Sequence, residues 1–330
     1  MKRQLLGVAA ILLSISTYAQ DNPLWMRYCA ISPDGTTIAF TYKGDIYTVP
    51  STGGRASQIT TNPAHDTKPI WSPDGKKIAF ASDRMGSMDI FEVNKEGGIP
   101  KRLTTHSGNE TPVAYKDAGH ILFLANIMPT VEDAQFPSGQ FQQVYEVNTE
   151  GGRPALFSSM PMEDISINHT GNTLLYHDKK GYEDPWRKHH TSSITRDIWL
   201  CSLNGNRTFR KQTTFNGEDR TPVWASDDKS FYYLSEEKGS FNIFKRDIDG
   251  NTSKQITNHT KHPVRFLSAA SNGTLCYGYD GEIYTVKEGA IPQKVQISIV
   301  TDKNDKDLIR QIKRSGATEI SLSPDAKEIA

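Results

Sequence analysis

Positive charge and imidazole groups are concentrated in one stretch of the sequence, between residues 179 and 196. The members are Lys179, Lys180, Arg187, Lys188, His189, His190 and Arg196, beside Tyr182 and Trp186. A guanidinium can hold a carboxylate through two parallel hydrogen bonds. This chemistry predicts a site for the carboxyl end of a peptide, formed by Arg187, Lys188, His189, His190 and Arg196. A solvated loop, or a surface that packs against a neighbouring domain, is the alternative.

Other polar residues invite a metal-binding interpretation. They are His259 and His262, three residues apart, and the adjacent pairs His65-Asp66 and His177-Asp178. Imidazole and carboxylate are common metal ligands, but neither cysteine partners nor a His-Glu-x-x-His pattern accompanies them. Because all fall at expected strand ends or turns, we interpret them as solvated turn residues. We expect no metal and no cofactor.

The sequence also lacks the Gly-x-Ser-x-Gly elbow that carries the nucleophile of many hydrolases. We therefore expect no catalytic residue in this chain. A carboxylate or amide recurs instead at a fixed place in the repeats described below, at Asp45, Asp89, Asp197, Asn242 and Glu282. Recurrence in successive repeats favours an architectural role, in which these groups accept hydrogen bonds from nearby turn amides.

The elements that position these residues belong to a repeated unit. Residues 31–54 read ISPDGTTIAFTYKGDIYTVPSTGG, and residues 71–98 read WSPDGKKIAFASDRMGSMDIFEVNKEGG. Each unit holds a strand ending in Ser-Pro, an Asp-Gly turn, two further strands, a Gly-Gly turn and a last strand ending in Leu-Thr or Ile-Thr. Four strands per unit is typical of a propeller blade.

Weaker copies of the unit continue along the chain, and six are complete near Thr301. The sequence therefore predicts an all-β fold, a six-bladed β-propeller of four-stranded antiparallel blades over residues 20–301. We expect residues 24–31 to be the innermost strand of blade one and residues 293–300 the outermost strand of blade six, with no strand borrowed across the seam. Long insertions at residues 128–142 and 179–196 are places where functional residues concentrate.

The two ends of the chain differ from the repeats. Lys2 and Arg3 precede an apolar run over residues 5–15, and Thr17-Tyr18-Ala19 offers a small-residue cleavage site. This pattern predicts a signal peptide over residues 1–19 and export to a bacterial periplasm, with the exterior as the alternative. Residues 302–314 are a charged connector, and residues 315–330 restart the repeat. We interpret them as the first strands of a second, truncated propeller, with a seventh blade of the same ring as the alternative.

Composition limits the class of partner. The chain has 330 residues, with 38 basic and 38 acidic side chains and a formal net charge of zero, and no long run of either sign interrupts it. Nucleic acid and anionic membranes are therefore disfavoured, no second apolar stretch is long enough to span a bilayer, and peptides or proteins are the expected partners. Cys29, Cys201 and Cys276 are odd in number and far apart, which argues against a disulfide framework, so we expect all three to be buried strand residues.

The unit resembles the TolB-like propeller repeat. The signal peptide, the six blades, the connector and the restarted repeat together resemble the amino-terminal part of bacterial tricorn-type serine peptidases. Residues 186–193, followed by Arg196-Asp197-Ile198-Trp199, are similar to the fourth-blade insertion of that family.

This resemblance implies a large homo-oligomeric peptidase that trims peptides inside a chamber. Its propellers form channels, and its catalytic groups lie in carboxy-terminal domains that are absent here. On this interpretation the chain alone is not an enzyme and the parent protein is. A TolB-like interaction propeller of the cell envelope and the lid propeller of a prolyl-oligopeptidase-type hydrolase are the alternatives.

Overall fold

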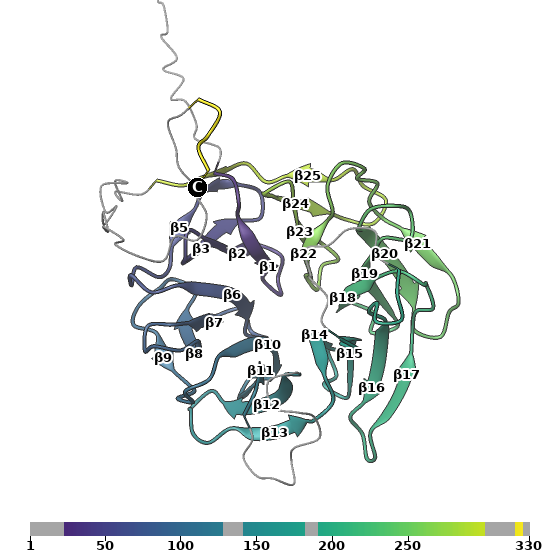
Figure 1. The fold of residues 1–330 in the computed structure, drawn as a ribbon, viewed down its shortest axis with the longest axis horizontal. Helices are drawn as coiled ribbons and strands as arrows, with labels where there is room; N and C mark the ends of the chain where they lie inside the picture. Colours follow the sequence, from purple (N-terminus) through teal and green to yellow (C-terminus); the bar gives the residue numbers. More distant parts are fainter. Residues whose placement is uncertain (1–22, 128–140, 182–190, 301–320, 326–330) are drawn as a thin grey trace, which may run out of the picture. The chain divides into compact units, whose positions relative to one another are not determined.

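A computed structural model describes residues 23–127, 141–181, 191–300 and 321–325. Six antiparallel sheets of four strands each follow one another around a ring, and within each sheet the strands lie in chain order (Figure 1). The structure therefore confirms the all-β class and the six-bladed propeller. The repeat had predicted both.

The strands are grouped here by their position in the blade. The innermost strands are β1 (Arg27–Ile31), β6 (Asp66–Trp71), β10 (Glu110–Asp117), β14 (Met162–Ile167), β18 (Asp219–Trp224) and β22 (Arg265–Ala269). The second strands are β2 (Thr37–Tyr42), β7 (Lys77–Ser82), β11 (His120–Ala125), β15 (Thr173–Asp178), β19 (Ser230–Ser235) and β23 (Leu275–Tyr279). The third strands are β3 (Asp45–Pro50), β8 (Asp89–Asn94), β12 (Gln143–Asn148), β16 (Ile198–Ser202), β20 (Asn242–Asp247) and β24 (Glu282–Val286). The outermost strands are β5 (Ser57–Gln58), β9 (Lys101–Arg102), β13 (Ala155–Ser158), β17 (Thr208–Lys211), β21 (Ser253–Gln255) and β25 (Gln293–Lys294).

The Ser-Pro-Asp-Gly sequences form the turn between the first two strands of a blade. In blade one the Ser32 hydroxyl donates to Asp34 Oδ1 at 2.6 Å, and the Thr36 amide donates to the same oxygen at 3.0 Å. The Gly35 amide closes the turn on the Ser32 carbonyl at 2.9 Å, with a φ of 78° that glycine adopts without strain. The hydrogen bonds from Ser32 and Thr36 lower the pKa of Asp34. These local contacts explain why the motif recurs.

The recurring carboxylate or amide fastens the third strand to the fourth. Gln58 Nε2 donates to Asp45 at 3.0 Å, Arg102 pairs with Asp89 at 2.8 Å, and Lys211 pairs with Asp197 at 2.8 Å. The equivalent partners are Thr257 for Asn242 and Lys294 for Glu282. The role is architectural, as the recurrence predicts, but these partners are side chains of or beside the outermost strand and not the turn amides that we expected.

In four blades a threonine just after the outermost strand binds the third strand as well. Three of these threonines end an Ile-Thr or Leu-Thr sequence, and Thr213 follows Gln212. The threonine hydroxyl accepts a hydrogen bond from the backbone amide of an isoleucine in the third strand of the same blade. The pairs are Thr60 with Ile46, Thr104 with Ile90, Thr213 with Ile198 and Thr257 with Ile243, at 2.9 to 3.0 Å. The hydroxyl thus satisfies a buried donor where the short outermost strand no longer can.

The apolar core lies between neighbouring blades. One cluster fills the contact of blades one and two with Ile78, Phe80 and Trp71, among others, and comparable clusters lie at the other contacts. Trp71 also donates its indole hydrogen to the Ala30 carbonyl of blade one at 2.8 Å. All three cysteines are free and buried, on β1, β16 and β23, which confirms the sequence-based interpretation.

The seam between blades six and one differs from the expectation. The outermost strand of blade six ends at Lys294, and the chain then forms β26 (Ile297–Ser298), which pairs in parallel with β4 (Gly54–Arg55) of blade one. Residues 293–300 are thus not a single strand of one blade. The Gly54 amide donates to the Gln296 carbonyl at 2.8 Å, so backbone hydrogen bonds join the first and last blades.

Beyond Ile299 the chain forms a second compact unit, residues 300–330, of which the structure describes a short piece. Ser323 Oγ donates to Asp325 Oδ1 at 2.7 Å, as Ser32 does to Asp34 in blade one. The restarted repeat therefore makes the same local turn contact. In the described parts of the chain, no helix has the length and apolar character needed to cross a membrane.

Candidate functional site: the central cavity

A cavity of about 490 Å³ lies among the innermost strands, and all six blades contribute to its wall. Its lining mixes aromatic, basic and acidic side chains, among them Tyr28, Lys68, Asp164, Arg196 and Phe266. A hydrogen-bonded strand normally sends alternate side chains to its two faces, both of which pack on neighbouring blades here. A specific distortion of the innermost strands is needed to direct side chains toward the axis.

That distortion is a β-bulge with one residue in the left-handed region. The register of the innermost strand shifts in all six blades. In five of them a non-glycine residue inside the shifted stretch has a positive φ: Tyr28 (51°), Lys68 (54°), Asp164 (47°), Thr221 (49°) and Phe266 (57°). Blade three has Pro112 here, whose ring holds φ near −65°. Such backbone is costly for tyrosine, threonine and phenylalanine, and conformations of this kind cluster at ligand sites.

Within this ring of bulged residues, the side chains touch one another. The Tyr28 and Phe266 rings are 4.8 Å apart between centroids, and Lys68 Nζ lies 5.7 Å from the Tyr28 ring centroid. The Thr221 hydroxyl donates to Asp164 Oδ2 at 2.7 Å. The ring therefore has an aromatic side with a cation and an acidic side.

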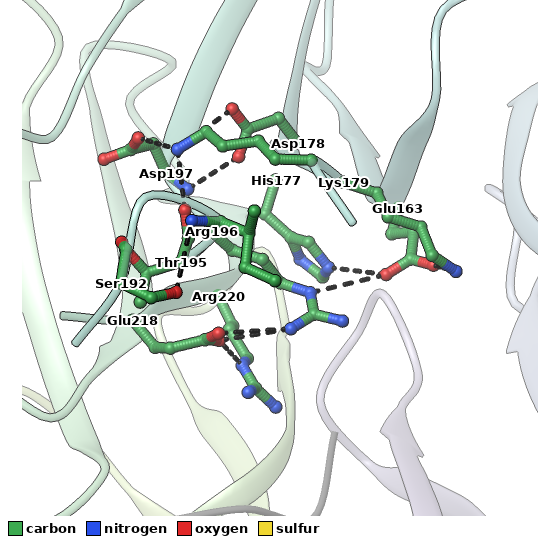
Figure 2. Close-up of polar contacts among 12 residues, drawn as sticks. Glu163, His177, Asp178, Lys179, Ser192, Thr195, Arg196, Asp197, Glu218 and Arg220 are labelled. Atoms are coloured by element: carbon green, nitrogen blue, oxygen red, sulfur yellow. Dashed lines mark hydrogen bonds and ion pairs between the residues drawn. The ribbon is translucent and has the colours of Figure 1, made fainter. Parts of the chain in front are cut away.

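A second polar group lies in the wall between blades four and five (Figure 2). Arg196 Nη1 is 3.2 Å from Glu218 Oε1, and Arg196 Nε is 3.6 Å from Glu163 Oε2. Arg220 also pairs with Glu218. These ion pairs connect β14 to the start of β18 through Arg196, which lies two residues before β16.

Glu163 is the centre of this group. His177 Nε2 lies 3.2 Å from Glu163 Oε2, and Lys179 Nζ donates to Oε1 at 2.9 Å (Figure 2). Burial raises the pKa of the Glu163 carboxyl, but the hydrogen bonds and charges of His177 and Lys179 outweigh it and hold this pKa well below its ordinary value. Glu163 is thus a fixed anion within a largely basic wall.

The structure separates the predicted carboxylate-binding residues. Arg187, Lys188, His189 and His190 lie outside the described residues. Arg196 lines the cavity, but it is 3% exposed and already bound to two carboxylates. In the folded protein the Arg196 guanidinium joins blades four and five, and its binding of a peptide carboxylate stays a prediction.

The neighbouring lysine is also engaged. Lys180 Nζ donates to the Thr195 carbonyl at 2.6 Å and to Asp197 at 2.5 Å, and Asp178 accepts from the Asp197 amide at 2.8 Å. These contacts fasten the two described ends of the blade-four insertion to each other. They give Lys180 a structural role.

The histidine pairs differ from the expectation of solvated turn residues at Asp66, His177 and His259. Asp66 is fully buried and takes both of its close contacts from one Arg84 nitrogen, at 2.8 and 3.0 Å, while His177 is 4% exposed. His259 stacks on Tyr279 at 3.9 Å and bonds to the Tyr277 hydroxyl at 3.0 Å. Among the residues that the structure describes, no three His, Cys, Asp or Glu side chains converge as metal ligands.

Sequence reasoning missed the bulged ring and its Asp164, Tyr28, Thr221 and Phe266. The signal in the sequence was weak, because glycine is the residue type that marks a positive φ and none of these residues is glycine. The strands that hold them have the composition of regular strands. In five of the six innermost strands, a polar or aromatic residue stands three positions before the end of the strand; blade three has Ala114 there.

The fold and the site together define a class: a six-bladed propeller whose distorted inner strands surround a charged cavity. The sequence matches the Tricorn protease N-terminal beta propeller domain over residues 23–290, and the chain belongs to this family. This finding agrees with the resemblance drawn from the repeats.

Two curated relatives illustrate the similarity. The chain is 26% identical over 281 residues to Tricorn protease homolog 1 of Streptomyces coelicolor, covering 84% of this chain and 25% of the relative. It is 26% identical over 296 residues to the Tricorn protease homolog of Saccharolobus solfataricus, covering 85% and 26%. The chain thus spans about a quarter of the length of these relatives.

A solved structure of the tricorn protease has the same fold. Its TM-score is 0.70 at 21% identity, and the match covers 86% of this chain and 27% of that one. A structure of TolB from Acinetobacter baumannii matches at a TM-score of 0.58 and 14% identity, covering 80% of this chain and 61% of that one. At these identities the likeness shows the propeller fold alone.

Proposed function

We propose that this propeller is the non-catalytic channel of a tricorn-like serine peptidase. In this proposal peptides pass through the central cavity to or from a catalytic chamber that other domains of a longer, homo-oligomeric protein build. The observation that carries the proposal is the cavity itself, in a chain of this family: all six inner strands line it, and five of them contribute charged or aromatic side chains. Such a lining suits zwitterionic peptides.

The proposal includes the periplasm as the site of action and a role for the basic insertion. The pattern of residues 1–19 supports export, and Arg187, Lys188, His189 and His190 supply the positive charge for a peptide carboxylate. Arg196 contributes by fixing the base of the insertion through its pairs with Glu163 and Glu218.

The test is obstruction of the cavity in the full-length protein. Thr111 lines the cavity from β10, and Thr111→Trp adds bulk there while Thr111→Val keeps the size of the side chain. We expect kcat/KM for a decapeptide to fall about tenfold or more in Thr111→Trp and to stay near the wild-type value in Thr111→Val. A variant that lacks the catalytic serine sets the background.

An unchanged kcat/KM in Thr111→Trp would contradict the channel role. If the full-length protein shows no serine-dependent cleavage at all, the peptidase itself is excluded and a TolB-like interaction propeller of the cell envelope becomes the better explanation. Export is checked by the intact mass of the mature protein, which should lack residues 1–19.

A further inference from the structure

Asp164 differs from the other acidic residues of the cavity wall in its ion pairs. Glu163 and Glu218 are each bound by two or more basic side chains. Across the described residues, no lysine or arginine nitrogen lies within 4.0 Å of Asp164, whose side chain is 49% exposed. A carboxylate directed into a cavity without a cation partner can accept one from a ligand.

The neighbouring histidine makes its shorter contacts with other groups. His177 Nε2 lies 3.2 Å from Glu163 Oε2, and the Thr221 amide nitrogen lies 3.3 Å from His177 Nδ1. Asp164 Oδ2 lies farther from His177 Nδ1, at 3.6 Å. Glu163 therefore takes the closer contact of His177, and the exposed Asp164 carboxylate is open to a cation of a ligand.

The other side of the ring offers aromatic faces. Tyr28 and Phe266 contact each other at 4.8 Å, and Lys68 already places its ammonium group 5.7 Å from the Tyr28 ring centroid. An ammonium over an aromatic face is stabilised by the ring quadrupole. Tyr28, Phe266, Asp164 and Thr221 all line the same cavity, so the aromatic and acidic sides of the ring face one space.

Strained backbone holds these groups in place. Tyr28, Asp164, Thr221 and Phe266 each have a positive φ, at bulges on four different blades. The Phe266 ring also depends on a glycine, because a Cβ at Gly278 would lie 2.9 Å from Phe266 Cδ2. Four separate departures from regular strand geometry line one cavity, which favours a binding role over packing alone.

We propose that Asp164, Thr221, Tyr28 and Phe266 form a subsite for a primary ammonium group, and that the amino end of a peptide is its ligand. The choice of a peptide rests on the proposed function, whereas the ammonium chemistry rests on the cavity alone. Asp164 accepts the charged hydrogen bond, the Thr221 hydroxyl orients the carboxylate, and the aromatic rings cover the cation. Lys68 competes for the same region.

The test is a calorimetric titration of the chain with three peptides. Trialanine amide carries a free amino end and no carboxylate, N-acetyl-trialanine amide carries neither, and N-acetyl-Ala-Lys-Ala amide carries an ammonium group on a side chain. A charged hydrogen bond is worth about 1.5–3 kcal/mol, so we expect trialanine amide to bind about tenfold or more tighter than its acetylated form.

Asp164→Asn should remove this preference. Asparagine keeps the shape, accepts the Thr221 hydrogen bond and tolerates a positive φ, so the fold is preserved. The matched control is Asp249→Asn, whose side chain is 88% exposed and pairs with Arg210 outside the cavity. It should keep the wild-type preference.

Equal binding of the free and acetylated peptides by the wild type would overturn the subsite, and so would an undiminished preference in Asp164→Asn. Binding of the lysine peptide as tight as that of trialanine amide would keep the ammonium site but overturn its assignment to the amino end. Because this assay needs no catalysis, its result is independent of whether the full-length protein cleaves peptides.

Discussion

Glu110 allows a quantitative prediction about the pH dependence of stability. It begins β10 between blades two and three, is fully buried, and has no ion pair within 4.0 Å among the described residues. The same position in blade two is Asp66, which Arg84 neutralises at 2.8 Å. Burial is the largest cause that raises the pKa of Glu110 to about 7; the Thr104 hydrogen bond opposes it and the charge of Asp89 adds to it.

The sign follows from linkage. In the unfolded chain the Glu110 carboxyl ionises near its ordinary pKa of 4.5, whereas in the folded protein it holds its proton until about pH 7. The folded state therefore loses stability as the pH rises from 4.5 to 7, and the loss is complete above 7. This difference in pKa between the folded and unfolded states corresponds to a loss of at most ~3 kcal/mol in the free energy of unfolding. We expect a loss of ~1–3 kcal/mol after relaxation around the buried group.

The perturbation is Glu110→Gln, which removes the ionisation and keeps the shape. Urea unfolding followed by circular dichroism at half-unit steps from pH 5 to pH 8 gives the free energy of unfolding for each protein. The wild type should lose ~1–3 kcal/mol more than Glu110→Gln over this range. Exposed Glu150, paired with Lys101 at 2.7 Å, provides the control Glu150→Gln, which should follow the wild-type profile. Parallel wild-type and Glu110→Gln profiles would refute the reasoning.

Two further predictions concern the seam and the buried ion pair. Gly53 and Gly97 share a φ of 93°, but a Cβ at Gly53 would lie 2.7 Å from the Gln296 carbonyl oxygen and one at Gly97 would lie 3.6 Å from its nearest atom. Both alanine variants carry the same backbone strain, and only Gly53→Ala adds a close contact with Gln296. Gly53→Ala should therefore lower the urea midpoint of unfolding more than Gly97→Ala does. Equal midpoints would exclude a role for the seam contact. Arg84→Met leaves Asp66 buried without its cation and should lower the free energy of unfolding by ~3–5 kcal/mol. The double variant with Asp66→Asn should restore much of this loss. A loss below ~1 kcal/mol in Arg84→Met would show that Asp66 is protonated or hydrated instead.

Much of the fold could be predicted because its contacts are local in sequence. The bond from Ser32 to Asp34 spans two residues, and the bond from Thr60 to Ile46 spans fourteen within one blade. Such contacts repeat whenever the motif repeats, so a pattern of turns and strands was enough for the blade count. The burial of Cys29 followed from its place on an apolar strand.

The candidate site was predicted less well. Arg196 was expected to bind a ligand because it stands in a basic stretch, yet Glu163 and Glu218 lie 33 and 22 residues away in sequence and neutralise it in the folded protein. His177 read as a turn residue and is buried beside Glu163. Charge concentration along the sequence does not reveal which charges find partners in neighbouring blades.

The sequence by itself determined the repeat, the four strands of each blade and the chemistry of the turns, because glycine, proline and aspartate restrict the backbone within a few residues. Only the tertiary structure decided which side chains reach the axis. The positive φ values of Tyr28, Asp164, Thr221 and Phe266 are unfavourable locally and persist because six packed blades fix the bulges that contain them. The same closure makes residues of the last blade neighbours of the first, as in the backbone bond from Gly54 to Gln296.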